Sequence, residues 1–195
     1  MSQKSTTIST SSPLKAGKKV PVAKSKQAEP ADMNSTFIPH LTSLKVGMKA
    51  PDFKGLNQQG QEINLKQFAG KKLILYFYPK DNTPTCTVES CNLQENNTFL
   101  KKEGYEIVGV SADTVKMHKK FADKYKLEFN LLADTEHQAI KAYDVWGKKK
   151  FMGVVFNGIV RTTFIIDEKG TIAHVINGVK SKEHARQILD LNIEY

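Results

Sequence analysis

Residues 73–95 read LILYFYPKDNTPTCTVESCNLQE, an apolar run followed at once by a polar one. The run from Leu73 to Tyr78 is apolar and aromatic throughout, which is typical of a strand buried on both faces of a sheet. Pro79 ends this run because it lacks the backbone N–H that a strand ladder needs. Thr83 is a good helix N-cap, and Pro84 suits the first helical position. The stretch therefore predicts a buried strand, a short loop and then a helix.

The two cysteines of the chain, Cys86 and Cys91, both fall in this predicted helix. With Thr83 as N-cap, Cys86 takes the third helical position. There the unsatisfied backbone N–H groups and the positive end of the helix favour the thiolate over the thiol. Cys86 is therefore expected to be nucleophilic. Glu89, one turn further on, would weaken this field unless its side chain points to solvent.

Cys91 lies too far along the helix to pair with Cys86 while the helix is intact. The Cα atoms of residues spaced in this way are about 8.6 Å apart in a regular helix, whereas a disulfide requires about 7 Å or less. A bond between the two sulfurs would therefore need the start of the helix to unwind. Such a pair would react in the folded helix and close only after local unfolding.

The bulk composition is that of a globular protein, with 39% hydrophobic and 25% charged residues in a chain of 195. No apolar run is long enough for a membrane span or a secretory signal, so a cytoplasmic protein is expected. The formal net charge is +9, which would suit a nucleic-acid partner. The chain has only two arginines, Arg161 and Arg186, which argues against that partner.

Composition also divides the chain. Residues 1–43 are dominated by Ser, Thr, Lys, Ala and Pro, with almost no large apolar side chains. This segment is predicted to be a disordered basic tail. The folded domain is predicted to cover residues 44–195.

The rest of the domain alternates predicted strands with predicted helices. Turn residues around Gly60 indicate a hairpin, and a second hairpin turns through Glu168–Gly170. The further strands are expected at 105–113, 129–134, 162–167 and 171–176, and the helices at 114–125, 136–143 and 181–191, the last capped by Ser181. This order predicts an α/β fold with a sheet of mixed strand direction and helices on both faces.

Two separated motifs resemble those of a known family. Pro79, Thr83 and Cys86 have the spacing of the peroxiredoxin active-site motif, and FYPKDNTPTCTVESC is similar to the peroxiredoxin Q subgroup, also called bacterioferritin comigratory proteins. Met152–Gly170 resembles the segment of that subgroup in which a glycine, an isoleucine and an arginine, here Arg161, precede a Thr-Phe strand. The segment KVGMKAPDF at 45–53 resembles its usual domain start.

The resemblance implies a thioredoxin-like fold and a thiol peroxidase that reduces hydrogen peroxide and organic hydroperoxides. Cys86 would be the peroxidatic cysteine, which becomes a sulfenic acid. Thr83 and Arg161 would bind the reacting oxygen and sulfur, and Pro79 would shape the pocket. Cys91 would resolve the sulfenic acid as an intramolecular disulfide.

The same resemblance implies a partner for recycling and indicates that no metal or flavin is needed. Thioredoxin or a similar dithiol would recycle the disulfide, and the protein would act as a monomer without metal or flavin. Two departures limit the likeness. Thr85 stands where the subgroup commonly has glycine, and Leu93-Gln94-Glu95 replaces its usual Phe-Arg-Asp.

Two other functions remain open at this level. One is a thiol–disulfide oxidoreductase, although that chemistry normally uses cysteines two residues apart. The other is a redox-regulated nucleic-acid-binding protein or chaperone that uses the basic tail, although residues 1–36 lack arginine and aromatic side chains for stacking. The five histidines show no paired spacing that would suggest a metal site.

Overall fold

The computed structural model describes residues 37–191, so most of the predicted basic tail, up to residue 36, lies outside the described residues, as do residues 192–195. The elements in chain order are β1 (Lys54–Leu56), β2 (Glu62–Asn64), the 3-10 helix η1 (Leu65–Phe68), β3 (Lys72–Phe77), α1 (Pro84–Glu95), α2 (Asn97–Lys102), β4 (Tyr105–Ser111), α3 (Val115–Tyr125), β5 (Asn130–Ala133), α4 (Gln138–Ala142), β6 (Trp146–Phe151), β7 (Val154–Ile159), β8 (Thr162–Ile166), β9 (Ile172–Ile176) and α5 (His184–Asp190).

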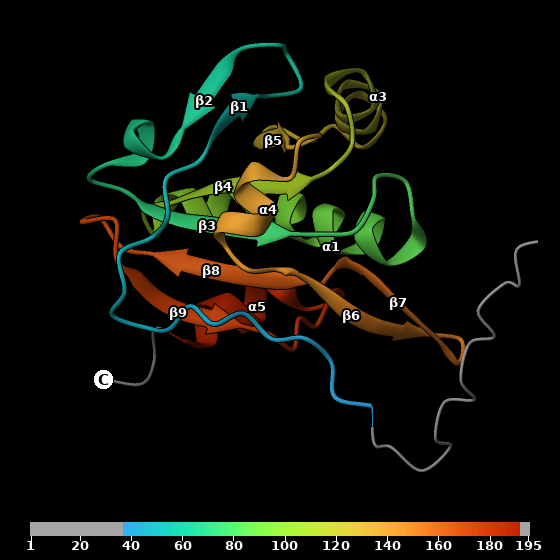
Figure 1. Ribbon diagram of the computed structural model, residues 1–195. Helices are drawn as coiled ribbons and strands as arrows, with labels where there is room; N and C mark the ends of the chain where they lie inside the picture. The colour runs from blue at the N-terminus through green and yellow to red at the C-terminus, as the bar shows by residue number, and fades with distance from the viewer. Residues whose placement is uncertain (1–36, 192–195) are drawn as a thin grey trace, which may run out of the picture. The chain divides into compact units, whose positions relative to one another are not determined.

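Strand β3 lies inside a mixed seven-stranded sheet of order β2-β1-β5-β4-β3-β8-β9 (Figure 1). It pairs in parallel with β4 and antiparallel with β8. Because both of its edges are paired and both of its faces are covered, Leu73–Phe77 are all buried. This explains why the run is apolar without alternation, and it confirms the predicted strand.

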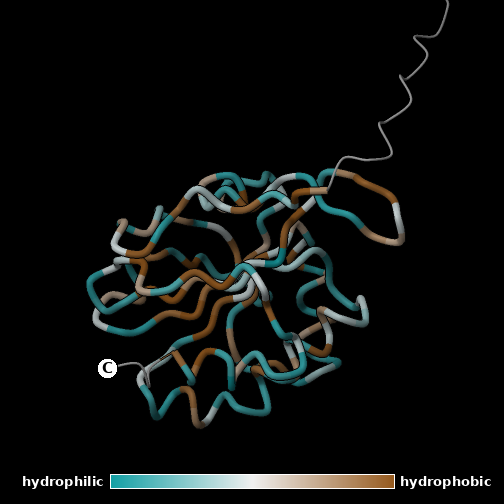
Figure 2. The backbone as a smooth tube through the Cα atoms, turned by 90° about the horizontal axis from the view of Figure 1, so that it is seen from below, coloured by the Kyte–Doolittle hydropathy of each residue, from teal (hydrophilic) through white to brown (hydrophobic). Residues whose placement is uncertain are grey.

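The two faces of the sheet carry separate apolar clusters. Leu75 and Phe77 point to the cluster that includes α4, whereas Ile74 and Tyr76 point to the cluster that includes α1, α2, α3 and α5. Figure 2 shows the apolar segments running through the middle of the domain, with hydrophilic segments on its outer loops. Helices on both faces of a mixed sheet confirm the predicted α/β architecture. None of the helices within residues 37–191 is long and apolar enough to cross a membrane.

A glycine in β4 sets how α1 rests on the sheet. A Cβ atom on Gly109 would come within 2.7 Å of the Tyr76 ring, so a side chain there would displace that ring. The Tyr76 hydroxyl is 2.9 Å from Ser90 Oγ on α1, and both groups are buried. The small residue in β4 thus allows a hydrogen bond that fixes the middle of α1 over β3.

The closing helix begins later than predicted. It starts at His184 with Glu183 as N-cap, so the expected start at residue 181 with Ser181 as cap was wrong. The helix starts later because a side chain of α1, rather than Ser181, caps its first turn. Asn92 Oδ1 on α1 accepts a hydrogen bond of 2.9 Å from the Ala185 N–H, and Asn92 Nδ2 donates one of 3.0 Å to the Lys182 carbonyl.

The buried face of α3 also differs from the prediction. The pattern suggested Met117, Phe121 and Tyr125, and Phe121 is buried, but Met117 is 36% exposed. His118 is fully buried instead, together with Ala122. A histidine can replace an apolar residue here because its ring finds polar partners, which are described below.

Strands β6 and β7 form a separate two-stranded hairpin that was not predicted. Figure 1 shows this hairpin extending away from the main sheet. Its three consecutive lysines, Lys148 to Lys150, hide the alternation expected of a strand. The packed chain also begins before residue 44, the predicted boundary, because the His40 N–H donates to the Lys148 carbonyl at 3.0 Å and the Thr42 hydroxyl donates to the Tyr143 carbonyl at 2.8 Å.

Candidate active site

Helix α1 begins as the sequence predicted. Thr83 is the N-cap residue, Pro84 follows at the first helical position, and Cys86 lies in the first turn. The Thr83 hydroxyl makes no cap bond to the helix and instead donates to the Lys80 carbonyl at 3.0 Å. The backbone N–H groups of the first turn therefore stay free of a side-chain cap. Cys86 is 1% exposed, so its sulfur lies just below the surface at this positive helix end.

Arg161 connects the two predicted motifs. It lies just before β8, and its Nη2 donates to Cys86 Sγ at 3.1 Å. Its Nη1 donates to Glu89 Oε2 on α1. The planar guanidinium thus bridges the sulfur and a carboxylate one helical turn away, a geometry that a lysine cannot reproduce.

Glu89 does not play the role expected from the sequence. Its side chain is fully buried rather than pointing to solvent, and it pairs with Arg161. The positive charge of Arg161 offsets the negative charge of the Glu89 carboxylate. Glu89 therefore positions Arg161 more than it weakens the positive field of the helix start at Cys86. A residue three positions after Cys86 shares its helix face, and this spacing is the signal that could have identified Glu89.

His184 completes this group from the start of α5. Its Nδ1 is 3.3 Å from Glu89 Oε1, and its Nε2 is 3.0 Å from Thr163 Oγ1 on β8. Burial, and then the charge of Arg161, lowers the pKa of His184 to about 3. The ring is therefore neutral near pH 7. No local pattern in the sequence marks His184, because its place depends on how α5 packs against α1.

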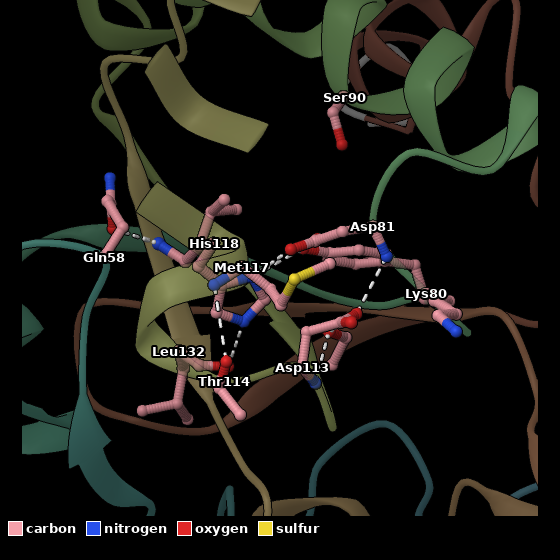
Figure 3. A network of polar contacts seen from close by, with 12 residues as sticks. Gln58, Lys80, Asp81, Ser90, Asp113, Thr114, Met117, His118 and Leu132 are labelled. Atoms are coloured by element: carbon pink, nitrogen blue, oxygen red, sulfur yellow. Dashed lines mark hydrogen bonds and ion pairs between the residues drawn. The ribbon is translucent and has the colours of Figure 1, made fainter. Parts of the chain in front are cut away.

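A buried polar cluster anchors the loop that joins Pro79 to α1 (Figure 3). Asp81 accepts a hydrogen bond of 2.7 Å from the Tyr78 hydroxyl, and its other oxygen is 2.9 Å from His118 Nδ1. His118 Nε2 is 3.1 Å from the Leu132 carbonyl, which can only accept, so this nitrogen carries a proton. The Asp81 N–H donates to Asp113 at 2.8 Å. These bonds fix the position from which Thr83 and α1 start.

Cys91 is half-buried and is not bonded to Cys86, since both thiols are free. Burial raises the pKa of the Cys91 thiol, and the nearby Glu95 carboxylate raises it further. Cys91 is therefore a weak nucleophile while α1 is folded.

Two further features border the site. Lys149 on β6 donates to the Ile159 carbonyl at 2.9 Å, and burial lowers its pKa while the charge of Cys86 opposes that change. Thr85 is exposed and lines a groove of about 450 Å³ between the start of α1 and the residues before α5. Within residues 37–191, no three or more His, Cys, Asp or Glu side chains are placed to hold a metal ion.

Comparisons with known proteins agree with this geometry. Residues 46–175 match the model of the AhpC/TSA family. The putative peroxiredoxin bcp of Haemophilus influenzae is 43% identical over 150 residues, which are 77% of this chain and 97% of the relative. The peroxiredoxin Bcp of Escherichia coli K12 is 41% identical over 150 residues, which are 77% of this chain and 96% of that protein.

Solved structures show the same fold. A peroxiredoxin Q structure from Xanthomonas campestris has a TM-score of 0.69 and 31% identity and covers 78% of this chain and 98% of its own. Peroxidoxin BcpB from Mycobacterium tuberculosis has a TM-score of 0.68 and 28% identity and covers 78% of this chain and 99% of its own. The fold is thus the thioredoxin-like fold that the resemblance implied, and the chain belongs to the AhpC/TSA family as a thiol peroxidase of the peroxiredoxin Q, or Bcp, subgroup.

Proposed function

We propose that Cys86 is the peroxidatic cysteine of this enzyme and that Arg161 is its main activating residue. The observation that carries this assignment is the 3.1 Å contact between Arg161 Nη2 and Cys86 Sγ in the first turn of α1. A cation and a positive helix end both stabilise a thiolate. The same guanidinium can hold the negative charge that develops on the peroxide oxygens in the transition state.

The first step joins sulfur to oxygen. The Cys86 thiolate attacks the terminal oxygen of ROOH, an S–O bond forms and the O–O bond breaks. The leaving alkoxide takes a proton to give ROH, and the sulfur becomes a sulfenic acid. Thr83, whose hydroxyl donates to the Lys80 carbonyl, would accept a hydrogen bond from the O–H of the incoming hydroperoxide, and Pro79 would shape the pocket wall.

The second step joins the two sulfurs. After the start of α1 unwinds, the Cys91 thiol loses its proton and its sulfur attacks the sulfur of the Cys86 sulfenic acid. An S–S bond forms, the S–O bond breaks, and the leaving hydroxide takes up a proton to become water. Thioredoxin or a similar dithiol then reduces this bond. The route requires neither a metal nor a second copy of the chain, so a monomer suffices. A free dithiol of this kind fits a reducing compartment such as the cytoplasm.

The substrate class follows from the chemistry and from one relative. The bacterioferritin comigratory protein of Xanthomonas campestris, one structure of which has a TM-score of 0.68 to this chain, has alkyl peroxide reduction activity. The exposed Thr85 and the groove beside α1 leave space for an organic group here. Hydrogen peroxide and alkyl hydroperoxides are therefore the proposed substrates.

Intact mass after one equivalent of hydrogen peroxide tests both cysteines together. We expect a loss of about 2 Da in the wild type and a gain of about 16 Da in Cys91→Ser. Cys86→Ser should show no change, because Cys91 reacts slowly in the folded helix. An unchanged wild type, or a gain of mass in Cys86→Ser equal to that in Cys91→Ser, would reject the assignment.

A further inference from the structure

A line of buried polar groups leads from the Cys86 sulfur into the domain. Arg161 contacts the sulfur, Glu89 contacts Arg161, His184 contacts Glu89, and Thr163 contacts His184. Glu89, His184 and Thr163 are each 0% exposed. Buried polar groups are normally satisfied by hydrogen bonds, and on this line only Glu89 Oε1 and His184 Nδ1, which are near each other, lack one.

The donors and acceptors along this line determine where the His184 proton lies. Glu89 Oε2 is occupied by Arg161, whereas Glu89 Oε1 and His184 Nδ1 lie 3.3 Å apart and neither has a hydrogen-bond partner in this arrangement. A neutral imidazole has one donor and one acceptor nitrogen. With the proton on Nδ1, a small turn of either side chain would let His184 donate to Glu89 Oε1, while its Nε2 accepts from the Thr163 hydroxyl. With the proton on Nε2, a buried carboxylate oxygen would face a nitrogen lone pair.

We propose that His184 is a positioning residue for peroxide reduction, which acts as the Nδ1–H tautomer and fixes Glu89 so that Arg161 keeps its contact with Cys86. Thr163 supports this tautomer from the other side of the ring. The Tyr76 ring, whose centroid is 6.2 Å from that of His184 in an edge-on contact, limits how the imidazole can turn. The proposal rests on the assignment of Cys86 as the peroxidatic cysteine.

The reason that His184 matters is the freedom of Glu89 without it. Without the His184 ring beside Oε1, the Glu89 carboxylate would be free to turn and accept both guanidinium nitrogens of Arg161, since paired Arg–carboxylate bonds are strong. Nη2 would then leave the sulfur. Loss of the His184 donor should therefore slow the reaction of Cys86 with peroxide, although His184 does not touch the sulfur.

Three substitutions separate hydrogen bonding from packing. In His184→Asn the amide nitrogen can take the place of Nδ1 and donate to Glu89. In His184→Gln the amide reaches the place of Nε2 and meets Thr163 instead, and His184→Phe keeps the ring volume without any donor. The readouts are the single-turnover rate with hydrogen peroxide and the ultraviolet absorbance of the Cys86 thiolate at fixed pH.

We expect His184→Phe and His184→Gln to react about tenfold more slowly than the wild type, which corresponds to about 1.4 kcal/mol. Their thiolate absorbance near neutral pH should fall, whereas His184→Asn should keep most of the rate and of the absorbance. Equal rates in His184→Phe and the wild type would overturn the proposal. An Asn variant that folds but is as slow as the Phe variant would also overturn it.

Nitrogen-15 NMR of the histidine rings tests the tautomer without any turnover. We expect the reduced wild-type protein to show a neutral His184 with its proton on Nδ1. The His118 signals are assigned separately, because its Nε2 faces the Leu132 carbonyl and its Nδ1 faces the Asp81 carboxylate. A His184 proton on Nε2, or a charged His184 ring, would overturn the proposal. The tautomer measured by NMR does not depend on the reaction of Cys86, so this test can fail or succeed separately from the proposed function.

Discussion

Arg161 makes two different contacts with one planar group, and this geometry yields the first prediction. Arg161→Lys keeps a positive charge, but a single ammonium cannot hold both Glu89 and the Cys86 sulfur in the same way. We expect Arg161→Lys to lower the rate of the peroxide reaction by about a hundredfold, which is the usual cost of losing one oriented donor to a transition state. Stopped-flow measurement of a single turnover checks this.

Arg186 offers a matched control for Arg161. It is the other arginine of the chain, and it pairs with Asp190 at 2.6 Å on the exposed side of α5. Arg186→Lys should react at the wild-type rate. A wild-type rate in Arg161→Lys would show that charge alone is sufficient and would remove the bridging geometry from the mechanism.

The buried, neutral His184 also predicts how stability depends on pH. Its pKa is about 3 in the folded protein, against 6.5 for an unperturbed histidine. A group whose folded pKa is lowered contributes stability that is fully present above the unfolded pKa and is lost as pH falls toward the folded pKa. Between pH 7 and pH 5 this loss should be about 2 kcal/mol in the free energy of unfolding.

Urea unfolding of the wild type and of His184→Asn at these two pH values isolates the contribution of His184. The Asn variant has no ring to protonate, so its stability should fall less over this range by about the same 2 kcal/mol. The comparison uses the change in the free energy of unfolding between pH 7 and pH 5 in each protein, because the two proteins need not be equally stable at pH 7. An equal change in the free energy of unfolding in both proteins would mean that burial does not keep His184 neutral.

At the scale of elements, side-chain contacts between α1 and α5 should oppose the proposed unwinding of α1. Asn92 both donates to the Lys182 carbonyl and accepts from the Ala185 N–H. We expect Asn92→Ala to destabilise the fold by about 1–2 kcal/mol, as the loss of a helix cap and of a second, exposed hydrogen bond does. The same change should speed the closing of the disulfide after sulfenic acid forms, since α1 loosens more easily.

The closing rate can be followed by quenching the reaction at set times and measuring the fraction of disulfide by mass. Asn92→Asp is the informative control, because it keeps the acceptor for Ala185 and loses only the donor to Lys182. The rate at which its disulfide closes should lie between the rates of the wild type and of Asn92→Ala. A closing rate that is the same in all three proteins would mean that unwinding starts elsewhere than at this contact.

The elements themselves were predictable wherever their signal is local. The strand from Leu73 and the start of α1 at Pro84 follow from apolar runs, a cap residue and proline, and they were confirmed. The start of α5 was wrong by a few residues because its cap comes from Asn92, which is distant in sequence. The hairpin of β6 and β7 was missed because its lysines mask the strand pattern.

The same division applies to the site. The sequence pointed to Cys86 and to Arg161, but the resemblance rather than any local rule linked the two. Glu89 was expected to weaken the field at the helix start unless its side chain pointed to solvent. Its spacing marks the helix face that it shares with Cys86, but its pairing with Arg161 depends on the position of β8. His184 joins the site only through the packing of α5 on α1. Long-range packing is what single-sequence patterns do not contain.

At the scale of the whole domain, the hairpin of β6 and β7 brings a third region of chain to the site. Lys149 is the half-buried member of its three lysines, and its charge acts on Cys86. We expect Lys149→Met to slow the peroxide reaction by less than tenfold, because the charge is removed without loss of the Arg161 contact. The difference should shrink as salt is added, since salt screens such interactions.

The neighbouring lysines provide the controls for this prediction. Lys148 and Lys150 are exposed on either side of Lys149, so Lys148→Met and Lys150→Met should react at the wild-type rate. Single-turnover rates at low and high salt compare all three. A loss of rate that is equal in the three variants would indicate a general effect of net charge rather than a contribution from Lys149.

The Asp81–His118 contact has a consequence for how the enzyme returns to its starting state. Starting a helix is costly, because several backbone angles must be fixed before the first hydrogen bond forms, whereas extending one is not. The residues just before α1 remain held by Tyr78, His118 and Asp113. If the proposed disulfide forms and is then reduced, α1 would rewind next to a segment that is already in place, which lowers the cost of forming its first turn again.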